Sequence, residues 1–117
     1  MAKTLEIPNS IESEMMVLGC MLTSAAALKL GAKVLEVFDF YAPQHKTIYQ
    51  TLKSLHDQNR PADVHLVCEE LKHSDKLSSV GGPSYVVSLA QYAGTSAYVE
   101  EYIEALKQHS NRRRLLD

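Results

Sequence analysis

Apolar residues recur every three or four positions along most of the chain, which is the spacing of one face of an α-helix. Short polar stretches, several of them with glycine or proline, separate these segments. Nowhere do β-branched residues alternate with polar ones, as they do in a half-buried strand. We therefore predict an all-α fold, a compact orthogonal bundle of about six helices. These helices are expected at residues 10–22, 25–37, 43–57, 64–72, 85–93 and 97–117.

The segment 38–55 organises this pattern, because it joins a turn rich in aromatic residues to a helix with one apolar face. Pro43 suits the first turn of that helix, where no backbone N–H is needed. Large aromatic side chains dominate the surface that a small core buries. We therefore expect the rest of the chain to pack around this corner. The predicted structural core consists of Leu18, Phe38, Phe40, Tyr41, Ile48, Leu52 and Leu55.

Residues that favour helix ends support these boundaries. Asn9, or Ser10 one position later, can cap the first helix. Glu12 and Glu14 suit its first turn, where the helix dipole favours acidic side chains. We expect these two carboxylates to act as caps or to be solvated. Gly19 lies within the first apolar stripe, where close approach of another helix would explain the lack of a side chain.

Candidate catalytic and metal-binding groups occur without the spacing that their chemistry needs. The five histidines include no i, i+4 pair with a carboxylate between, and no Cys-x-x-Cys accompanies them, so we expect no metal site. Cys20 and Cys68 fall in apolar helical patterns and are expected to be reduced and buried. Gly81-Gly82-Pro83 lacks the lysine and the hydroxyl residue of a phosphate loop and is expected to form a turn.

His45 is the most interesting of these groups, because it falls on the apolar face of the helix expected at 43–57. We expect a partly buried ring, hydrogen-bonded to a backbone carbonyl or to Asp39. The alternative is a base or a pH switch, and a small enzyme that uses His45 with Asp39 is one hypothesis for the function. No nucleophile stands beside His45 in the sequence, so the structural interpretation is favoured.

Composition points to one ordinary soluble domain and excludes several classes of protein. The chain has 117 residues, of which 45% are hydrophobic and 22% charged. Its net charge of -2 lacks the basic excess of a domain that binds duplex phosphates, so we expect no direct contact with nucleic acid. No apolar run approaches the roughly 20 residues of a membrane span, and the start lacks the apolar core of a signal peptide. We therefore expect no membrane partner and a cytoplasmic location.

The last apolar stripe runs to the end of the chain. Leu115-Leu116-Asp117 provides neither a capping glycine nor a proline, which are common signals of a helix end. We therefore expect this helix to be cut, and the chain to be a piece of a longer protein.

Ordered blocks of residues extend over nearly the whole chain, from about Ile7 to Leu116, and the ordered set at this spacing is quite specific. They resemble the N-terminal region of the bacterial replicative DNA helicase family, DnaB. The blocks are Pro8, Ser10-Ile11-Glu12, Glu14, Val17-Leu18-Gly19 and Leu22; Asp39-Phe40-Tyr41, Pro43, His45 and Ile48-Tyr49; Arg60-Pro61, Asp63, Leu71, Leu77, Val80-Gly81-Gly82, Tyr85 and Leu89; and Thr95, Ala97, Tyr102-Ile103, Arg113 and Leu115.

The resemblance implies a helical bundle followed by a helical hairpin. In that family the hairpins pair, and the paired domains form a collar, a trimer of dimers, above a hexameric ring of motor domains. The implied organisation is a flexible tail at 1–8, the bundle at 9–95, and at 96–117 the first arm of the dimerisation hairpin.

The resemblance also implies the partners and which domain of the parent protein carries the catalytic activity. Primase docks on the collar through its C-terminal domain, and in some bacteria the helicase loader binds there too. ATP and Mg belong to the motor domain, which carries a phosphate loop that this sequence lacks. The implied role is therefore non-catalytic, with no cofactor in this chain. The alternative is a stand-alone helical adaptor with no motor domain.

The last helix carries the residues that we expect near the self-association or primase surface. They are polar or aromatic side chains along its length: Tyr98, Glu101, Tyr102, Arg112, Arg113 and Arg114.

Overall fold

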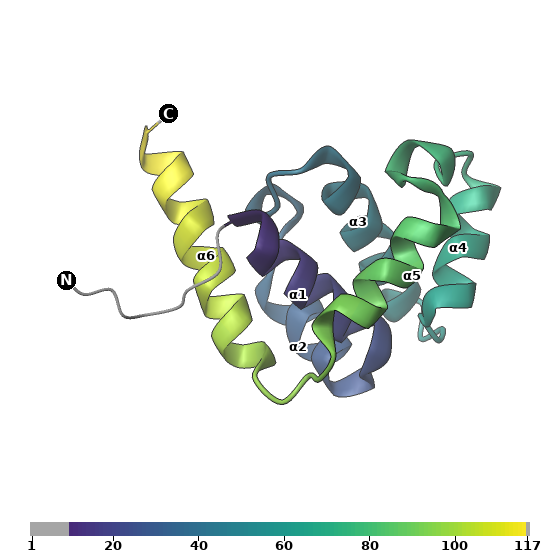
Figure 1. Cartoon of the computed structure of the whole chain (residues 1–117), viewed down its shortest axis with the longest axis horizontal. Helices are drawn as coiled ribbons and strands as arrows, with labels where there is room; N and C mark the ends of the chain where they lie inside the picture. The colour runs from purple at the N-terminus through teal and green to yellow at the C-terminus, as the bar shows by residue number, and fades with distance from the viewer. Residues whose placement is uncertain (1–9, 117) are drawn as a thin grey trace.

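The computed structural model describes residues 10–116 (Figure 1). Over these residues the chain forms six α-helices and two short 3-10 turns, and no strand, which confirms the all-α prediction. Asn9 and the expected tail at 1–8 lie outside the described residues. The elements are α1 (Ser10–Thr23), α2 (Ala25–Val34), η1 (Val37–Asp39), α3 (Pro43–Asp57), α4 (Val64–His73), η2 (Ser78–Val80), α5 (Gly82–Ala93) and α6 (Val99–Leu116).

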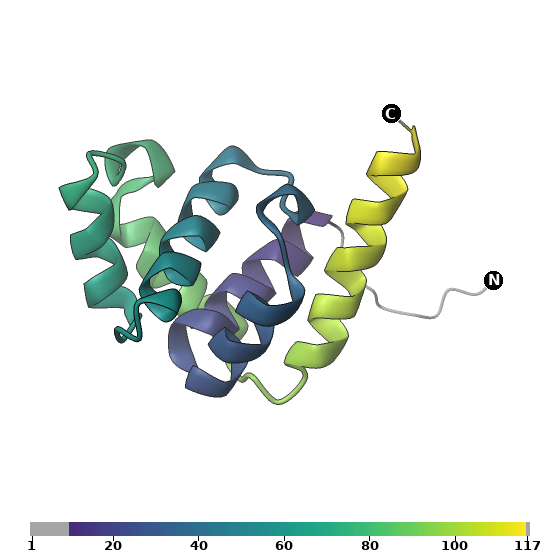
Figure 2. The same ribbon diagram turned by 180° about the vertical axis from the view of Figure 1, so that it is seen from behind.

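Helix α1 is the central element, because it packs against α5, α6, α2 and α3. Both views show it inside the bundle, with α6 along one end of the molecule and α4 at the other (Figures 1 and 2). Gly19 lets α1 approach α5: a Cβ there would collide with the Leu89 carbonyl oxygen and with the Ala93 Cβ. The expected close helix approach at Gly19 is therefore confirmed.

Phe40, just before α3, and Tyr49 of α3 are both completely buried in the core. Their rings stack with centroids 5.0 Å apart. The Tyr49 hydroxyl donates a hydrogen bond of 2.6 Å to the Leu35 carbonyl oxygen, so its polar end is satisfied inside the core. The predicted core residues Leu18, Phe40, Ile48, Leu52 and Leu55 are all fully buried.

Two residues of the predicted core are not in it. The side chains of Phe38 and Tyr41 are 48% and 61% exposed. The reason lies in the backbone, since the 3-10 turn η1 is followed by an extended residue at Phe40. Neighbouring side chains then project in different directions, and Asp39 and Phe40 take the two inward positions. The prediction that all the aromatics of this corner pack inward was therefore wrong.

Helix boundaries follow local chemistry closely. Asp63 caps α4 by accepting a hydrogen bond of 2.9 Å from the Leu66 amide. Asn59 ends the preceding helix with φ +58°, the left-handed conformation that asparagine tolerates. Helix α2 ends at Val34, three residues before the expected end. Helix α5 begins at Gly82, three residues before the expected start, with Pro83 in its first turn.

Helix α6 lies at one end of the molecule with one side against the bundle and the other side open (Figures 1 and 2). Ile103 and Leu106 are buried and attach it to the core. Its main contact partners are α1 and the 3-10 turn η1. The description of 96–117 as the arm of a hairpin stays a prediction.

Candidate functional site

The structural feature that fixes α6 is the buried carboxylate of Asp39. Its Oδ2 accepts hydrogen bonds from the Glu36 amide at 2.8 Å and from Lys107 Nζ at 3.1 Å, and its Oδ1 accepts one from the Ser110 hydroxyl at 2.8 Å. The Asp39 carbonyl oxygen accepts a further bond of 2.9 Å from the Arg113 guanidinium. A buried charge is tolerated only when it is paired and hydrogen-bonded. Asp39 therefore anchors three side chains of α6.

A second buried carboxylate, Glu14 of α1, holds the same corner from the other side. Its Oε2 accepts a hydrogen bond of 2.6 Å from the Tyr41 amide, and its Oε1 accepts one of 3.3 Å from the Ala42 amide. Glu14 was expected to cap a helix or to be solvated, and that prediction was wrong. Its side chain points into the bundle because these two amides, at the entry to α3, have no carbonyl partner there.

His45 continues this network to α5. Its Nδ1 lies 2.7 Å from Glu14 Oε1, and its Nε2 lies 2.6 Å from the Tyr85 hydroxyl. Burial, and then the charge of Glu14, raise the pKa of Tyr85, so the hydroxyl keeps its proton at neutral pH. The expected partners of His45, a backbone carbonyl or Asp39, were wrong. Asp39 faces α6, and Glu14 takes its place.

These groups do not form the catalytic pair that the enzyme hypothesis needs. His45 and Asp39 bond to different partners, and Glu14, His45 and Asp39 are completely buried. A general base must reach the proton that it abstracts from a substrate. The arrangement instead ties α1, α3, α5 and α6 to one corner of the chain.

Above this network lies an exposed surface that we call the aromatic–arginine edge, formed by Phe38, Tyr41, Arg113 and Arg114. The Arg114 guanidinium lies 4.5 Å from the centroid of the Phe38 ring, and the Arg113 guanidinium lies 5.4 Å from that of Tyr41. Such contacts are cation–π interactions. The same Arg113 is bonded to the Asp39 carbonyl, so the buried network positions the exposed edge.

The other residues expected at a contact surface divide into two groups. Tyr98, just before α6, is exposed, and so are Glu101 and Arg112 on the outer side of α6. Tyr102 is half-buried and packs against the core. The helix therefore presents two separate surfaces, its outer side and the aromatic–arginine edge.

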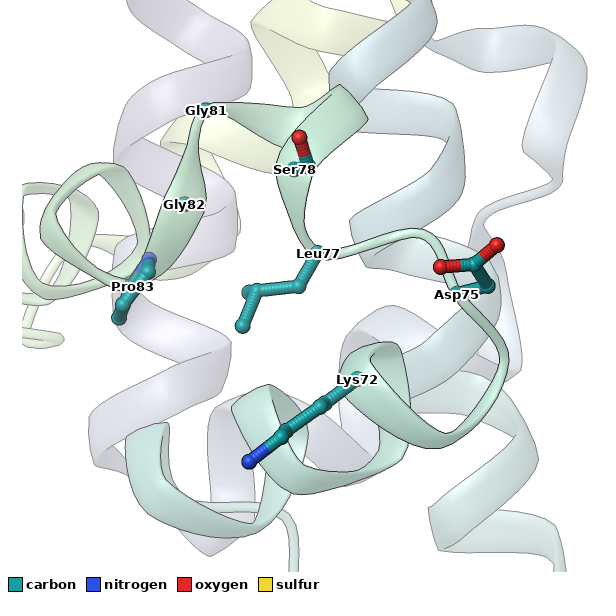
Figure 3. Close-up of a pocket in the computed structure, with 7 residues that line it drawn as sticks. All are labelled: Lys72, Asp75, Leu77, Ser78, Gly81, Gly82 and Pro83. Carbon is teal, nitrogen blue, oxygen red and sulfur yellow. The ribbon is translucent and has the colours of Figure 1, made fainter.

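At Gly81-Gly82-Pro83 the chain turns into α5, as expected, and the segment borders an open hollow between α4 and α5. The hollow has a volume of about 690 Å³ and is lined by Lys72, Asp75, Leu77, Ser78, Gly81, Gly82 and Pro83. Figure 3 shows Leu77 and Pro83 on one side of it and Lys72 extending along α4. A single surface lysine selects no class of ligand.

Within residues 10–116, no group of three or more histidine, cysteine, aspartate or glutamate side chains is arranged to hold a metal ion. Cys20 and Cys68 are free thiols in the structure, as expected. Cys20 is buried, whereas Cys68 is only partly buried. None of the described helices combines the length and the apolar character of a membrane span.

Sequence reasoning missed Glu14, Tyr85, Lys107 and Ser110 as members of the network. A signal for all four was present in the helical spacing. Each stands four residues from a buried apolar residue, Glu14 from Leu18, Tyr85 from Leu89, Lys107 from Ile103 and Ser110 from Leu106. The spacing does not reveal their partners, because these come from distant parts of the chain.

Comparison with known proteins gives consistent matches. The family model described as DnaB-like helicase N terminal domain matches residues 6–108. The Replicative DNA helicase DnaC of Bacillus subtilis is 38% identical over 109 residues, which are 93% of this chain and 24% of the relative. The Replicative DNA helicase DnaB of Geobacillus stearothermophilus is 37% identical with the same coverage of 93% and 24%. The chain thus spans about a quarter of the length of these curated relatives.

A solved structure supports the same relationship. The crystal structure of the N-terminal domain of DnaB helicase from Mycobacterium tuberculosis superimposes with a TM-score of 0.88 at 31% sequence identity. The match covers 95% of this chain and 80% of that chain.

Proposed function

Because the chain belongs to the DnaB-like helicase N-terminal domain family, we propose that it is the non-catalytic assembly and docking domain of a replicative DNA helicase. The match of residues 6–108 to that family is the observation that carries the proposal. The parent protein unwinds duplex DNA in the cytoplasm, and the ATP- and Mg-dependent step belongs to a motor domain elsewhere in it. This domain contributes self-association and a platform for primase and, in some bacteria, for the helicase loader.

The aromatic–arginine edge is the surface that we propose for docking. Arginine and tyrosine are enriched among the residues that dominate protein–protein binding energy. The Arg113 side chain is held by the Asp39 carbonyl, so little conformational entropy remains to be lost on binding. A rigid cationic and aromatic surface suits a partner that offers carboxylates beside an apolar side chain.

The test compares the intact parent helicase with the parent that lacks residues 1–117, and then with single substitutions in the edge. We expect the deletion to abolish binding of the primase C-terminal domain and to weaken the hexamer in sedimentation velocity. Tyr41→Ala and Arg114→Ala should each weaken primase binding by about tenfold or more, measured by calorimetry.

Lys33→Ala is the matched control, because Lys33 is an exposed cation on α2, outside the edge. It should leave primase affinity unchanged. Full primase binding and an intact hexamer in the deleted protein would contradict the proposed function. If both edge variants keep wild-type primase affinity while the deletion abolishes binding, the docking surface lies elsewhere on the domain.

A further inference from the structure

A further open hollow, which we call the α1–α3 hollow, lies at the C-terminal ends of α1 and α3. Its volume is about 560 Å³, within the range of roughly 300–1,000 Å³ that is usual for ligand pockets. The corner between α1 and α2 lines one part of it, and the loop that joins α3 to α4 lines another. Two connections that are distant in the sequence therefore form one concave surface.

The floor of the α1–α3 hollow is apolar and continuous with the core. Met21, Leu22, Leu28 and Ala62 line the hollow, and all four belong to the main core cluster. In the hollow between α4 and α5, by contrast, Leu77 is the large apolar side chain. An apolar side chain that enters the α1–α3 hollow would extend the core and leave water.

The rim of the hollow carries basic side chains. Lys29 of α2 is exposed, and within residues 10–116 it forms no ion pair. The exposed Arg60 guanidinium lies 2.9 Å from Gln58 Oε1 but 3.5 Å from the nearest Glu70 carboxylate oxygen. That longer contact is at the limit of a hydrogen bond, so the guanidinium can still bind a closer carboxylate. The partly exposed imidazole of His56 is a third basic group.

Among the described residues, one acidic side chain lines the hollow, and it is already engaged. Asp63 Oδ1 accepts the hydrogen bond of 2.9 Å from the Leu66 amide that caps α4. The first turn of α2, which also borders the hollow, contains no acidic residue. The hollow is therefore rich in hydrogen-bond donors and short of negative charge, and carboxylates from a partner would complement it.

The α1–α3 hollow is remote from the aromatic–arginine edge. Glu14, near the start of α1, bonds to the Tyr41 amide just before α3, so both helices begin beside the edge. Thr23 and His56, near the other ends of the same helices, line the hollow. Helices of 14 and 15 residues are about 21–23 Å long. A partner in the hollow therefore leaves the edge uncovered.

We propose that the α1–α3 hollow binds an acidic segment of a partner protein. One apolar side chain of that segment contacts Leu22 and Leu28, and its carboxylates lie near Lys29 and Arg60. The inference goes beyond the proposed function, because it concerns a second partner on a surface separate from the edge.

A peptide fits this surface better than the other classes of ligand. Proteins that bind single-stranded nucleic acid stack the bases on aromatic side chains, and no phenylalanine, tyrosine or tryptophan lines the hollow. Small-molecule sites bury most of the surface of their ligand, whereas this hollow is open. An open apolar floor with a basic rim instead suits a side chain that projects from an acidic segment.

The test titrates the isotope-labelled 117-residue chain with a synthetic peptide in which one leucine is flanked by glutamates, and amide chemical shifts report binding. We expect saturable shifts confined to residues 21–29 and 56–63. A peptide with lysines in place of the glutamates should bind about tenfold or more weakly, because the charges then repel. A peptide with serine in place of the leucine should lose a similar factor, because the apolar contact is absent.

Two substitutions change the charge of the hollow without removing a buried side chain. Lys29→Glu reverses an exposed charge, and Ala25→Glu adds a carboxylate in the first turn of α2, where the helix dipole favours it. Each should raise the dissociation constant of the leucine–glutamate peptide by about tenfold or more. Lys76→Glu is the matched control, because it makes the same charge reversal at an exposed position outside the hollow. It should leave the affinity unchanged, and circular dichroism should show native melting for all three variants.

Several results would overturn the proposal. They are the absence of shifts at about 1 mM peptide, wild-type affinity in both hollow variants, and equal binding of the lysine peptide. Tighter binding of an oligothymidylate at the same residues would assign the hollow to nucleic acid instead. The proposed function fails separately, when deletion of residues 1–117 leaves primase binding and the parent hexamer intact.

Discussion

At the scale of single residues, the buried carboxylates of Asp39 and Glu14 hold distant segments of this domain together. A buried ion is costly unless hydrogen bonds compensate it. Asp39 receives bonds from a backbone amide, an ammonium group and a hydroxyl, and Glu14 receives two backbone amide bonds and contacts a histidine. Each carboxylate joins segments that are distant in the sequence. Their stabilisation is therefore specific to one arrangement of the helices.

Phe40 and Phe38 allow a direct comparison of a buried and an exposed ring two positions apart. Phe40→Ala should lower the free energy of unfolding by about 3–5 kcal/mol, because it empties a fully buried site beside Tyr49. Phe38→Ala removes the same atoms from a half-exposed site and should cost about 1 kcal/mol or less. Urea denaturation of both variants measures the difference, and equal costs would contradict the observed burial.

Removal of the His45 ring tests whether the buried network is structural. His45→Ala deprives Glu14 and Tyr85 of a common partner and should cost about 3–5 kcal/mol, the cost of breaking a buried pair. His73→Ala, at an exposed position on α4, is the control and should change stability by about 0.5 kcal/mol or less. If the His45→Ala protein melts like the wild type, the structural role is contradicted, and His45 becomes a candidate for a functional role.

At the scale of elements, α6 differs from the other helices in how it is attached. Its first half contributes Ile103 and Leu106 to the core, whereas its second half is held by polar contacts of Lys107, Ser110 and Arg113 with Asp39. Apolar contacts are non-directional, but hydrogen bonds depend on geometry. The second half of α6 is therefore the part of the molecule that a single substitution can release.

Asp39→Ala should release the second half of α6 while α3 stays folded. We expect amide hydrogen exchange to accelerate over residues 107–116 and to remain slow over residues 48–55, because only the former segment loses its buried partners. Asp57→Ala is the control, since that carboxylate forms an exposed ion pair with Lys53, and a surface pair contributes little to stability. Uniform acceleration throughout the chain would show that α6 does not open independently.

At the scale of the whole molecule, the buried Tyr49 and the partly buried Tyr85 contribute to the response to alkaline pH. Burial is the main cause that raises the pKa of both Tyr49 and Tyr85 above the ordinary value of about 10. The unfolded chain then loses these protons at lower pH than the folded chain. Stability contributed by the protonated tyrosines is complete below pH 10 or so and decreases as the pH rises through and above that value.

The melting temperature should accordingly fall between about pH 10 and pH 11, with Tyr49 as a main contributor. Tyr49→Phe removes one of the ionisable groups, so its melting temperature should fall less steeply over the same interval. The variant starts from a lower stability at neutral pH, because the Leu35 carbonyl loses its bond to the hydroxyl. Parallel pH profiles of the two proteins, followed by differential scanning calorimetry, would contradict this assignment.

The sequence allowed much of the fold to be predicted, but little of the polar network. Apolar spacing located all six helices of the described region, and Asp63 and Gly19 behave as their chemistry indicates. Local patterns do not reveal which distant groups meet, so the partners of Asp39 and Glu14 were not found. Phe38 was misplaced because composition identifies aromatic residues without indicating the direction in which a 3-10 turn points them.

The central position of α1 has a consequence for synthesis of the protein. Among the described helices, α1 leaves the ribosome first, and its principal partners α5 and α6 follow last. The Glu14 carboxylate is linked through His45 to Tyr85, more than half the chain away. Contacts this distant in sequence form late, after the cost of closing a long loop has been met. The nascent chain therefore emerges with its future centre packed only against α2 and α3, and it acquires its full native packing when α5 and α6 have been synthesised.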